Sequence, residues 1–186
     1  MGRKIIAGES FPPLQARNIH GTEVTIPRPG SWTHLQFRRF AGCPICNLHL
    51  QSIIARDQEI VEAGIREVVV FHSSDAELLH YQGRFRFDVI GDPTKALYRK
   101  YGVESSISAF LSLKAWAASV KGNLKKDKPD ITGMPLGGIM GLPAEFLISA
   151  DGTVKASHYG KHAYDQWSVD ELLALSRSPM GSTQHR

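Results

Sequence analysis

Apolar residues recur along the chain at spacings that predict short strands in some segments and helices in others. Alternating or β-branched apolar runs are typical of strands, whereas apolar residues three and four positions apart are typical of helices. In chain order, the predicted strands are a hairpin within 11–31, single strands at 32–40, 65–73 and 87–92, and two strands within 143–160. The predicted helices are 44–62, 74–85, 92–103 and 168–178.

Turn and capping residues support several of these boundaries. Pro44 stands at a first helical position, where its missing N–H would have had no helical partner. Asp92 is the expected cap of the helix that follows it. Ser168 and Glu171 have the spacing of a capping box at the start of the last helix. The Ala-Asp-Gly run at 150–152 predicts the turn between the last two strands.

The alternation of strands and helices predicts an α/β layer fold with a partly parallel sheet. We expect one domain over 1–178, with an insertion at about 105–142 and a loose tail at 179–186. The insertion starts with a run compatible with an amphipathic helix and continues into a glycine-rich apolar stretch. It is too long for a plain connection, so we expect it to pack on the body or to form a lid or dimer surface near the active site.

Composition places the chain among ordinary globular proteins. It has 186 residues, of which 42% are hydrophobic and 22% are charged, enough for one real core. No run approaches the roughly 18 apolar residues that span a bilayer, and the first residues lack the long apolar stretch of a signal peptide. We therefore expect a cytoplasmic protein.

Basic residues are densest in 121–130, where the lack of interleaved aromatic residues favours a solvated loop over a nucleic-acid surface.

The chain contains only two cysteines, Cys43 and Cys46. In a reducing compartment a CxxC pair is a redox or metal motif, and the loop that it closes is too short to add much stability. Cys43 precedes a helix start, where N–H groups and the helix dipole favour a thiolate. We therefore expect an exposed Cys43 with a depressed pKa to attack, and a more shielded Cys46 to resolve the mixed disulfide. Arg38 or Arg39 adds positive potential, because strand alternation places only one of them on a given face.

Two other interpretations of the cysteines remain open at this point. Zinc could be bound by Cys43, Cys46 and His49 with a distant fourth ligand such as His72 or His80. The second CxxC or HxxxH that usually completes such a site is missing, so we expect no metal. The cysteines could also be inert core residues, although their position at a strand-to-helix turn argues against this.

The order of these motifs resembles that of the thioredoxin-like superfamily. The motifs are a strand, Gly-Cys-Pro-Ile-Cys at 42–46, alternating helices and strands, and then Pro143 before the strand that reads AEFLISADG. More narrowly, residues 11–175 are similar to the redoxin branch, which is the alkyl hydroperoxide reductase/thiol-specific antioxidant (AhpC/TSA) group with its peroxiredoxin-like members. The resemblance implies a central mixed β-sheet flanked by helices, with an N-terminal β-hairpin and an insertion before the strand that follows a cis-proline.

The resemblance also implies site residues. Cys43 and Cys46 are then catalytic, and Pro44, Leu142 and Pro143 contact the substrate. A cis bond before Pro143 would offer a strand-like edge to a substrate peptide and keep metals away from the thiols, and such a bond is accessible to proline. A trans proline at the first residue of a strand is the alternative.

The sequence departs from true peroxiredoxins at the groups that polarise a peroxide. Peroxiredoxins carry a proline seven residues, and a threonine or serine three residues, before the attacking cysteine, where this chain has Gln36 and Phe40. They also carry an arginine where this chain has Pro143. Without these groups the electrostatic part of peroxidase catalysis is lost. The buried acid of thioredoxin has no clear counterpart near Gln36 or Phe37 either.

These observations favour a thiol–disulfide oxidoreductase that acts on protein or small-molecule disulfides. The first alternative is a thiol peroxidase, in which a sulfenic acid on Cys43 condenses with Cys46. The second is a redox-sensing binding protein that contacts its partner through the insertion around Trp116. We expect a thiol reductant such as thioredoxin or glutathione, no cofactor, no nucleic acid or membrane partner, and a homodimer as one candidate assembly.

Overall fold

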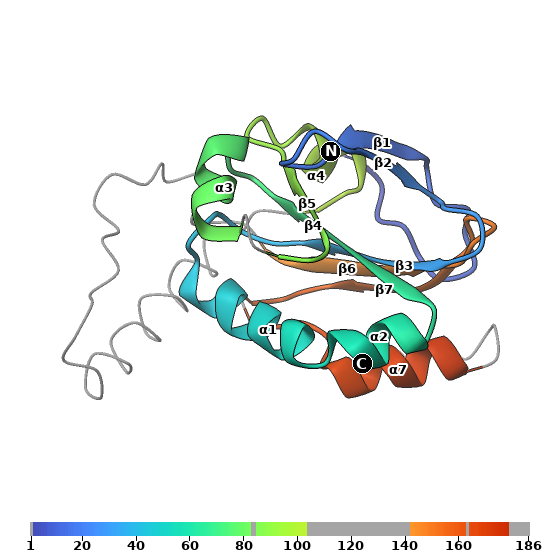
Figure 1. Cartoon of the computed structure of the whole chain (residues 1–186). Coiled ribbons are helices and arrows are strands. Elements are labelled where there is room, and N and C mark those ends of the chain that lie inside the picture. Colours follow the sequence, from blue (N-terminus) through green and yellow to red (C-terminus); the bar gives the residue numbers. More distant parts are fainter. Residues whose placement is uncertain (1, 83–84, 104–141, 163, 179–186) are drawn as a thin grey trace.

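Five strands form a central mixed sheet in the order β5-β4-β3-β6-β7, and β1 and β2 form a separate hairpin. The structure, a computed structural model, describes residues 2–82, 85–103, 142–162 and 164–178 (Figure 1). The strands are β1 (Leu14–Arg17), β2 (Glu23–Ile26), β3 (Trp32–Phe37), β4 (Ile65–Phe71), β5 (Asp88–Gly91), β6 (Ala144–Ile148) and β7 (Val154–Tyr159). The helices are α1 (Pro44–Ala55), α2 (Asp57–Glu62), α3 (Asp75–Gln82), α4 (Ala96–Lys100) and α7 (Val169–Arg177).

The sheet is partly parallel, as the alternation of strands and helices predicts. β3 pairs with β4 and β4 pairs with β5 in parallel, whereas β6 runs antiparallel to both β3 and β7. The hairpin β1–β2 is antiparallel. This is the expected thioredoxin-like arrangement with an added N-terminal hairpin. It places the end of β3, and therefore the turn that leads into α1, in the middle of the sheet.

Helices and the hairpin cover both faces of this sheet. In Figure 1, α1, α2 and α7 lie against one face, while α4 and the β1–β2 hairpin lie against the other. The buried apolar residues divide in the same way. Ile53, Leu147 and Leu172 belong to a cluster between the sheet and the α1–α7 layer. Phe37 and Phe146 belong to the larger cluster under the hairpin and α4. Successive strand residues point to opposite faces, so each strand contributes to both cores.

The predicted helix at 44–62 is interrupted at Arg56, which divides it into α1 and α2. Arg56 has φ −121° and ψ 21°, outside the range of an α-helix. Its guanidinium binds Glu59 at 2.7 Å and Asp170 of α7 at 2.7 Å. The apolar spacing did not predict this break, because spacing carries no information about a contact with a helix so distant in the sequence.

Two predicted helix caps are confirmed. The Ser168 hydroxyl accepts the Glu171 N–H, and the Glu171 carboxylate accepts the Ser168 N–H, so the capping box is complete. The Asp92 carboxylate accepts the N–H groups of Ala96 and Leu97. The helix α4 is nevertheless shorter than predicted, since the residue before it adopts a left-handed conformation.

Two predicted segments lie largely outside the described residues. These are the tail at 179–186 and, apart from Leu142, the insertion at 105–142. Their proposed roles therefore stay predictions. Among the helices of the described ranges, none is both long and apolar enough to cross a membrane.

His72, which directly follows β4, is a buried histidine on the α4 face. Its side chain is 7% exposed, and its ring packs edge-on against Tyr98 at a centroid distance of 5.5 Å. Burial, with the positive charges of Lys95 and Arg39 nearby, lowers the pKa of His72 to about 4. The imidazole is therefore neutral in the folded protein at pH 7.

We predict that Ser168→Ala lowers the free energy of unfolding by about 1 kcal/mol, because the cap of α7 is lost. Urea unfolding followed by circular dichroism measures this change, and the m-value should stay constant. Ser176→Ala, in the same helix, is the control. Among the described residues Ser176 donates to the Leu173 carbonyl alone, and alanine is the better helix former, so no loss is expected. Equal losses in the two variants would contradict the capping argument.

A second prediction concerns acid stability. The pKa of His72 is about 4 when folded and about 6.5 when unfolded. The unfolded chain therefore binds more protons between these values, and stability present above pH 6.5 is lost as the pH falls toward 4. His72→Phe should reduce this loss by on the order of 2 kcal/mol. Urea unfolding across that pH range tests the prediction, and parallel pH dependences in the two proteins would refute it.

Candidate active site

The two cysteines lie at the turn from β3 into α1. Cys43 is the extended cap residue immediately before α1, and its carbonyl accepts the Asn47 N–H at 2.9 Å. Cys46 lies in the first turn of the helix, and its Sγ is 2.9 Å from the Sγ of Cys43. Both are free cysteines. A small movement would bring the sulfurs to the bonding distance of a disulfide, which is about 2.05 Å.

Both cysteines are buried, so the expectation of an exposed Cys43 is wrong. Each has 0% exposure. The turn before Cys43 is closely packed, because a Cβ on Gly42 would lie 3.0 Å from the ring of Tyr81 in α3. Gly42 also has φ 70°, which glycine adopts without strain. A helix start by itself predicts an accessible thiol, but in the folded chain both thiols at this helix start are buried.

The ionisation of the pair also differs from the expectation. Burial and the neighbouring Cys46 sulfur raise the pKa of Cys43. Burial acts on Cys46 in the same sense, but other contacts outweigh it and lower the pKa of Cys46 to about 7. These contacts are the hydrogen bonds from the Cys43 thiol and the Arg39 backbone N–H, and the positive charges of Arg38 and Arg39. As the pH rises, Cys46 therefore loses its proton near neutral pH, and Cys43 remains a thiol.

Two arginines supply this positive charge, and both follow β3 directly. Arg38 and Arg39 have 0% exposure. Arg38 donates to Nδ1 of His49 in α1 at 2.9 Å. The Arg39 guanidinium carbon lies 5.6 Å from the centroid of the Phe40 ring, and its charge acts on His72 at the α4 face. The two side chains thus leave the backbone toward different layers, and both stabilise a charge at the start of α1.

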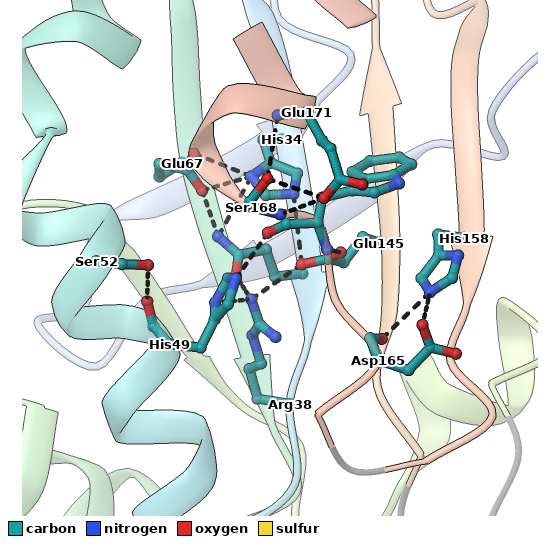
Figure 2. A network of polar contacts seen from close by, with 12 residues as sticks. His34, Arg38, His49, Ser52, Glu67, Glu145, His158, Asp165, Ser168 and Glu171 are labelled. Carbon is teal, nitrogen blue, oxygen red and sulfur yellow. Dashed lines mark hydrogen bonds and ion pairs between the residues drawn. The ribbon is translucent and has the colours of Figure 1, made fainter. Parts of the chain in front are cut away.

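A buried polar network extends from Arg38 beneath α1 and α7 (Figure 2). Arg38 Nη2 lies 3.0 Å from a Glu145 carboxylate oxygen and also donates to the Gln36 side chain. The Gln36 amide donates to Glu67, which lies 2.9 Å from His34 Nδ1. The residues come from β3, the turn after it, β4, β6 and α1, and every one is buried: His34, Gln36, Arg38, Glu67, Glu145 and His49.

His49 connects this network to α1 and to the segment before α7. Burial and the charge of Arg38 lower the pKa of His49 to about 3, so the ring is neutral at pH 7. A guanidinium can only donate, so Nδ1 of His49 accepts from it. Nε2 therefore carries the proton and donates it to the Trp167 carbonyl at 2.7 Å. The other end of this contact is also fixed, because the Trp167 N–H donates to Glu145 at 2.6 Å.

The side chains considered as zinc ligands are engaged elsewhere or lie apart. Both ring nitrogens of His49 already have protein partners. Within the described ranges, no group of three or more His, Cys, Asp or Glu side chains is placed to hold a metal ion.

Sequence reasoning missed the buried network. Polar residues at 34, 36 and 38 alternate with apolar ones, and that pattern by itself indicates a strand with one solvated face. A lone acid inside an apolar run, such as Glu145, was a second signal, because a buried carboxylate requires partners. The register pairs Gln36 with Glu145 across β3 and β6. The neighbouring strand therefore supplies a buried acid beside Gln36. The sequence alone showed no clear counterpart of thioredoxin's buried acid at this position.

The expected substrate-contacting residues lie at the same end of the sheet as the cysteines. Pro44 begins α1. Leu142 and Pro143 immediately precede β6, whose first residue pairs with the last residue of β3. Among the described residues the cis peptide bond is Ile26–Pro27, so the expected cis bond before Pro143 is wrong. The Pro143 carbonyl instead continues the β6–β7 ladder by accepting the Gly160 N–H at 2.9 Å, and trans is the preferred form even before proline.

Solved structures with similar folds include a peroxidoxin, a peroxiredoxin and a protein assigned to thiol:disulfide interchange. Peroxidoxin BcpB from Mycobacterium tuberculosis has a TM-score of 0.67 at 16% identity, covering 93% of this chain and 97% of its own. A cysteine-to-serine mutant of peroxiredoxin 6 from Arenicola marina has a TM-score of 0.67 at 20% identity, covering 92% of this chain and 72% of its own. A protein assigned as the thiol:disulfide interchange protein DsbE of Chlorobium tepidum has a TM-score of 0.61 at 18% identity, covering 94% and 99%. At these identities the similarity establishes the fold.

The sequence itself identifies the family. No curated protein matches the chain. The family model described as AhpC/TSA antioxidant enzyme matches residues 52–162, more than half of the chain, including β4, β5, β6 and β7. Both cysteines precede the matched range, so the site geometry is independent of this match. With its thioredoxin-like fold, the chain belongs to the AhpC/TSA antioxidant enzyme family.

Proposed function

We propose that the protein is a thiol–disulfide oxidoreductase that cycles Cys43 and Cys46 between two thiols and one disulfide. The observation that carries the proposal is the 2.9 Å contact between two free sulfurs, one of which has a pKa of about 7. A thiolate that forms near neutral pH is the nucleophile of disulfide exchange. A second sulfur within bonding reach completes the reaction without a cofactor.

The position of one proton decides which sulfur attacks. We assign the attack to Cys43, because it precedes the helix whereas Cys46 lies inside it. Transfer of the proton across the 2.9 Å contact to Cys46 gives Cys43 the negative charge. The Cys43 thiolate then bonds to one sulfur of the substrate disulfide and displaces the other as a thiolate.

The second step closes the protein disulfide. Cys46 loses its proton, attacks the Cys43 sulfur and displaces the remaining substrate sulfur as a thiolate. The substrate disulfide has then gained two electrons and the protein has lost two. A thiol reductant such as thioredoxin or glutathione restores the two thiols. We assign substrate contact to Pro44, Leu142 and Pro143, which lie at the cysteine end of the sheet.

The family description favours a second candidate, a thiol peroxidase. In that reaction a thiolate attacks a hydroperoxide, forming a sulfenic acid and releasing an alcohol or water. The second cysteine then condenses with the sulfenic acid and releases water. It ranks second because Gln36 is engaged by Arg38 and Glu67, and neither Phe40 nor Pro143 has a side chain that donates a hydrogen bond to a peroxide.

Stopped-flow tryptophan fluorescence separates the two functions. The reduced protein should be oxidised by a disulfide such as oxidised glutathione faster than free cysteine is. Cys46→Ser should stop at a mixed disulfide on Cys43, detected by mass spectrometry, and Cys43→Ser should form none.

The same measurement with hydrogen peroxide identifies the alternatives. Fast, saturable oxidation by peroxide but not by disulfides would establish the peroxidase instead. No oxidation faster than that of free cysteine by either reagent would leave the redox-sensing binding protein, and both catalytic proposals would fail.

We also predict the pH dependence of thiolate formation, measured by ultraviolet absorbance of the reduced protein. One thiolate should form with a pKa of about 7, and the second should form only well above pH 9. Cys43→Ala should raise the pKa of Cys46, since the thiol that donates to it is lost while burial remains. Two thiolates that titrate together near the pKa of a free cysteine would contradict the shared proton.

A further inference from the structure

The Arg38 guanidinium is a buried charge whose contacts are unevenly distributed. Its Nη2 atom lies within hydrogen-bond distance of Gln36, of His49 and, at 3.0 Å, of Glu145, and these three acceptors share its two N–H groups. Its Nε and Nη1 atoms are buried and have no hydrogen-bond partner within the described part of the chain. The cation is therefore held at its Nη2 end, where it forms an ion pair with Glu145 (Figure 2).

The same contacts place this cation beside the cysteine pair. Arg38 lies in the turn that links β3 to α1, and His49 follows Cys46 by one helical turn. The Arg38–His49 bond of 2.9 Å thus connects the guanidinium to the helix turn that carries Cys46. His49 cannot rotate freely, because its second nitrogen is bound to the Trp167 carbonyl. Arg38 is consequently fixed by α1, by β6 and by the segment before α7.

We infer that Arg38 is a positioning residue that stabilises the thiolate of Cys46, and that Glu145 sets how much of the Arg38 charge the sulfur experiences. Arg38 acts by its field and not by contact with substrate. The consequence for turnover rests on the proposed exchange function, whereas the electrostatic effect on Cys46 does not.

The other groups near Cys46 do not take over the electrostatic role of the Arg38–Glu145 ion pair. Arg39 contributes its backbone N–H and its charge from the neighbouring position. The neutral Cys43 thiol donates a hydrogen bond. Tyr98 of α4 stays protonated, because burial, the Asp92 carboxylate and the Cys46 charge raise its pKa. His49 stays neutral. The negative charge nearest to Arg38 is therefore that of Glu145, and Glu67 lies beyond Gln36.

This arrangement predicts shifts of opposite sign for the two members of one ion pair. Removing the cation in Arg38→Met leaves Glu145 uncompensated, so the Cys46 thiolate is destabilised. Removing the anion in Glu145→Gln leaves Arg38 without its direct acidic partner, so the thiolate is stabilised. A more stable thiolate is a better leaving group, and it makes the dithiol form more favourable relative to the disulfide. A purely structural role would disturb the site in the same way in both variants.

The experiment measures the ultraviolet thiolate titration of the reduced full-length protein and the disulfide equilibrium against glutathione. Arg38→Met should raise the pKa of Cys46, and Glu145→Gln should lower it. The equilibrium constant for disulfide formation should rise in the first variant and fall in the second, by about tenfold for each unit of pKa change when it is measured at a pH well above the pKa of Cys46 in every variant. The double variant Arg38→Met/Glu145→Gln should lie between wild type and Arg38→Met.

The double variant and one control variant keep the test decisive. Arg38→Met strands the buried Glu145 carboxylate and is expected to be unstable, so the double variant, which removes both members of the Arg38–Glu145 ion pair, reports on the loss of the cation if the single variant does not fold. Asp88→Asn is the matched control. It removes a partly buried acid of β5 that binds Arg66 at 2.7 Å and has no contact with the Arg38 network among the described residues, and it should shift neither readout.

Shifts of the same sign in the two single variants, or no shift in Glu145→Gln and in the double variant, would overturn the inference. The thiolate titration needs no substrate. An inactive protein with opposite shifts would therefore refute the exchange function alone, and an active protein without them would refute this inference alone.

Discussion

Burying the charges of Arg38, Glu67 and Glu145 costs free energy that only closely placed opposite charges and hydrogen bonds offset. Each of these side chains is almost completely removed from solvent. The contacts that compensate them join three strands to α1 and to the segment that precedes α7 (Figure 2). The α1–α7 layer therefore cannot shift over the sheet without breaking bonds to buried charges. The same bonds hold the turn that carries the cysteines.

The chemistry of the cysteine pair follows from this environment more than from the helix alone. A helix start favours a thiolate at Cys43, but burial acts against it. Cys46 lies one turn deeper and is equally buried, yet the donors and cations beside it lower its pKa to about 7. In a buried site, the thiol with the lower pKa is the one that has hydrogen-bond donors and positive charges nearer to its sulfur. When one proton has left the pair, the remaining proton lies between two sulfur atoms 2.9 Å apart and can be bound by either of them.

Local signals in the sequence predicted much of the fold. The capping box of Ser168 and Glu171 is present because its hydrogen bonds involve residues three positions apart. Strand positions were predicted from alternation, and the thioredoxin-like order followed from the motifs. The break at Arg56 was missed, because it coincides with a bond to Asp170 in a helix far along the chain. The buried face of β3 was missed because polar alternation has the same pattern on a solvated strand and on one covered by helices.

Residue types and their local spacing were sufficient to identify the family, the α/β order and the CxxC pair. Three properties of the site became visible only in the folded chain: both cysteines are buried, Cys46 has the lower pKa, and Glu145 lies against Arg38. These properties depend on the distances between residues far apart in the sequence. The strength of a charge interaction and the cost of desolvation both depend on such distances, and no pattern within a short window contains them.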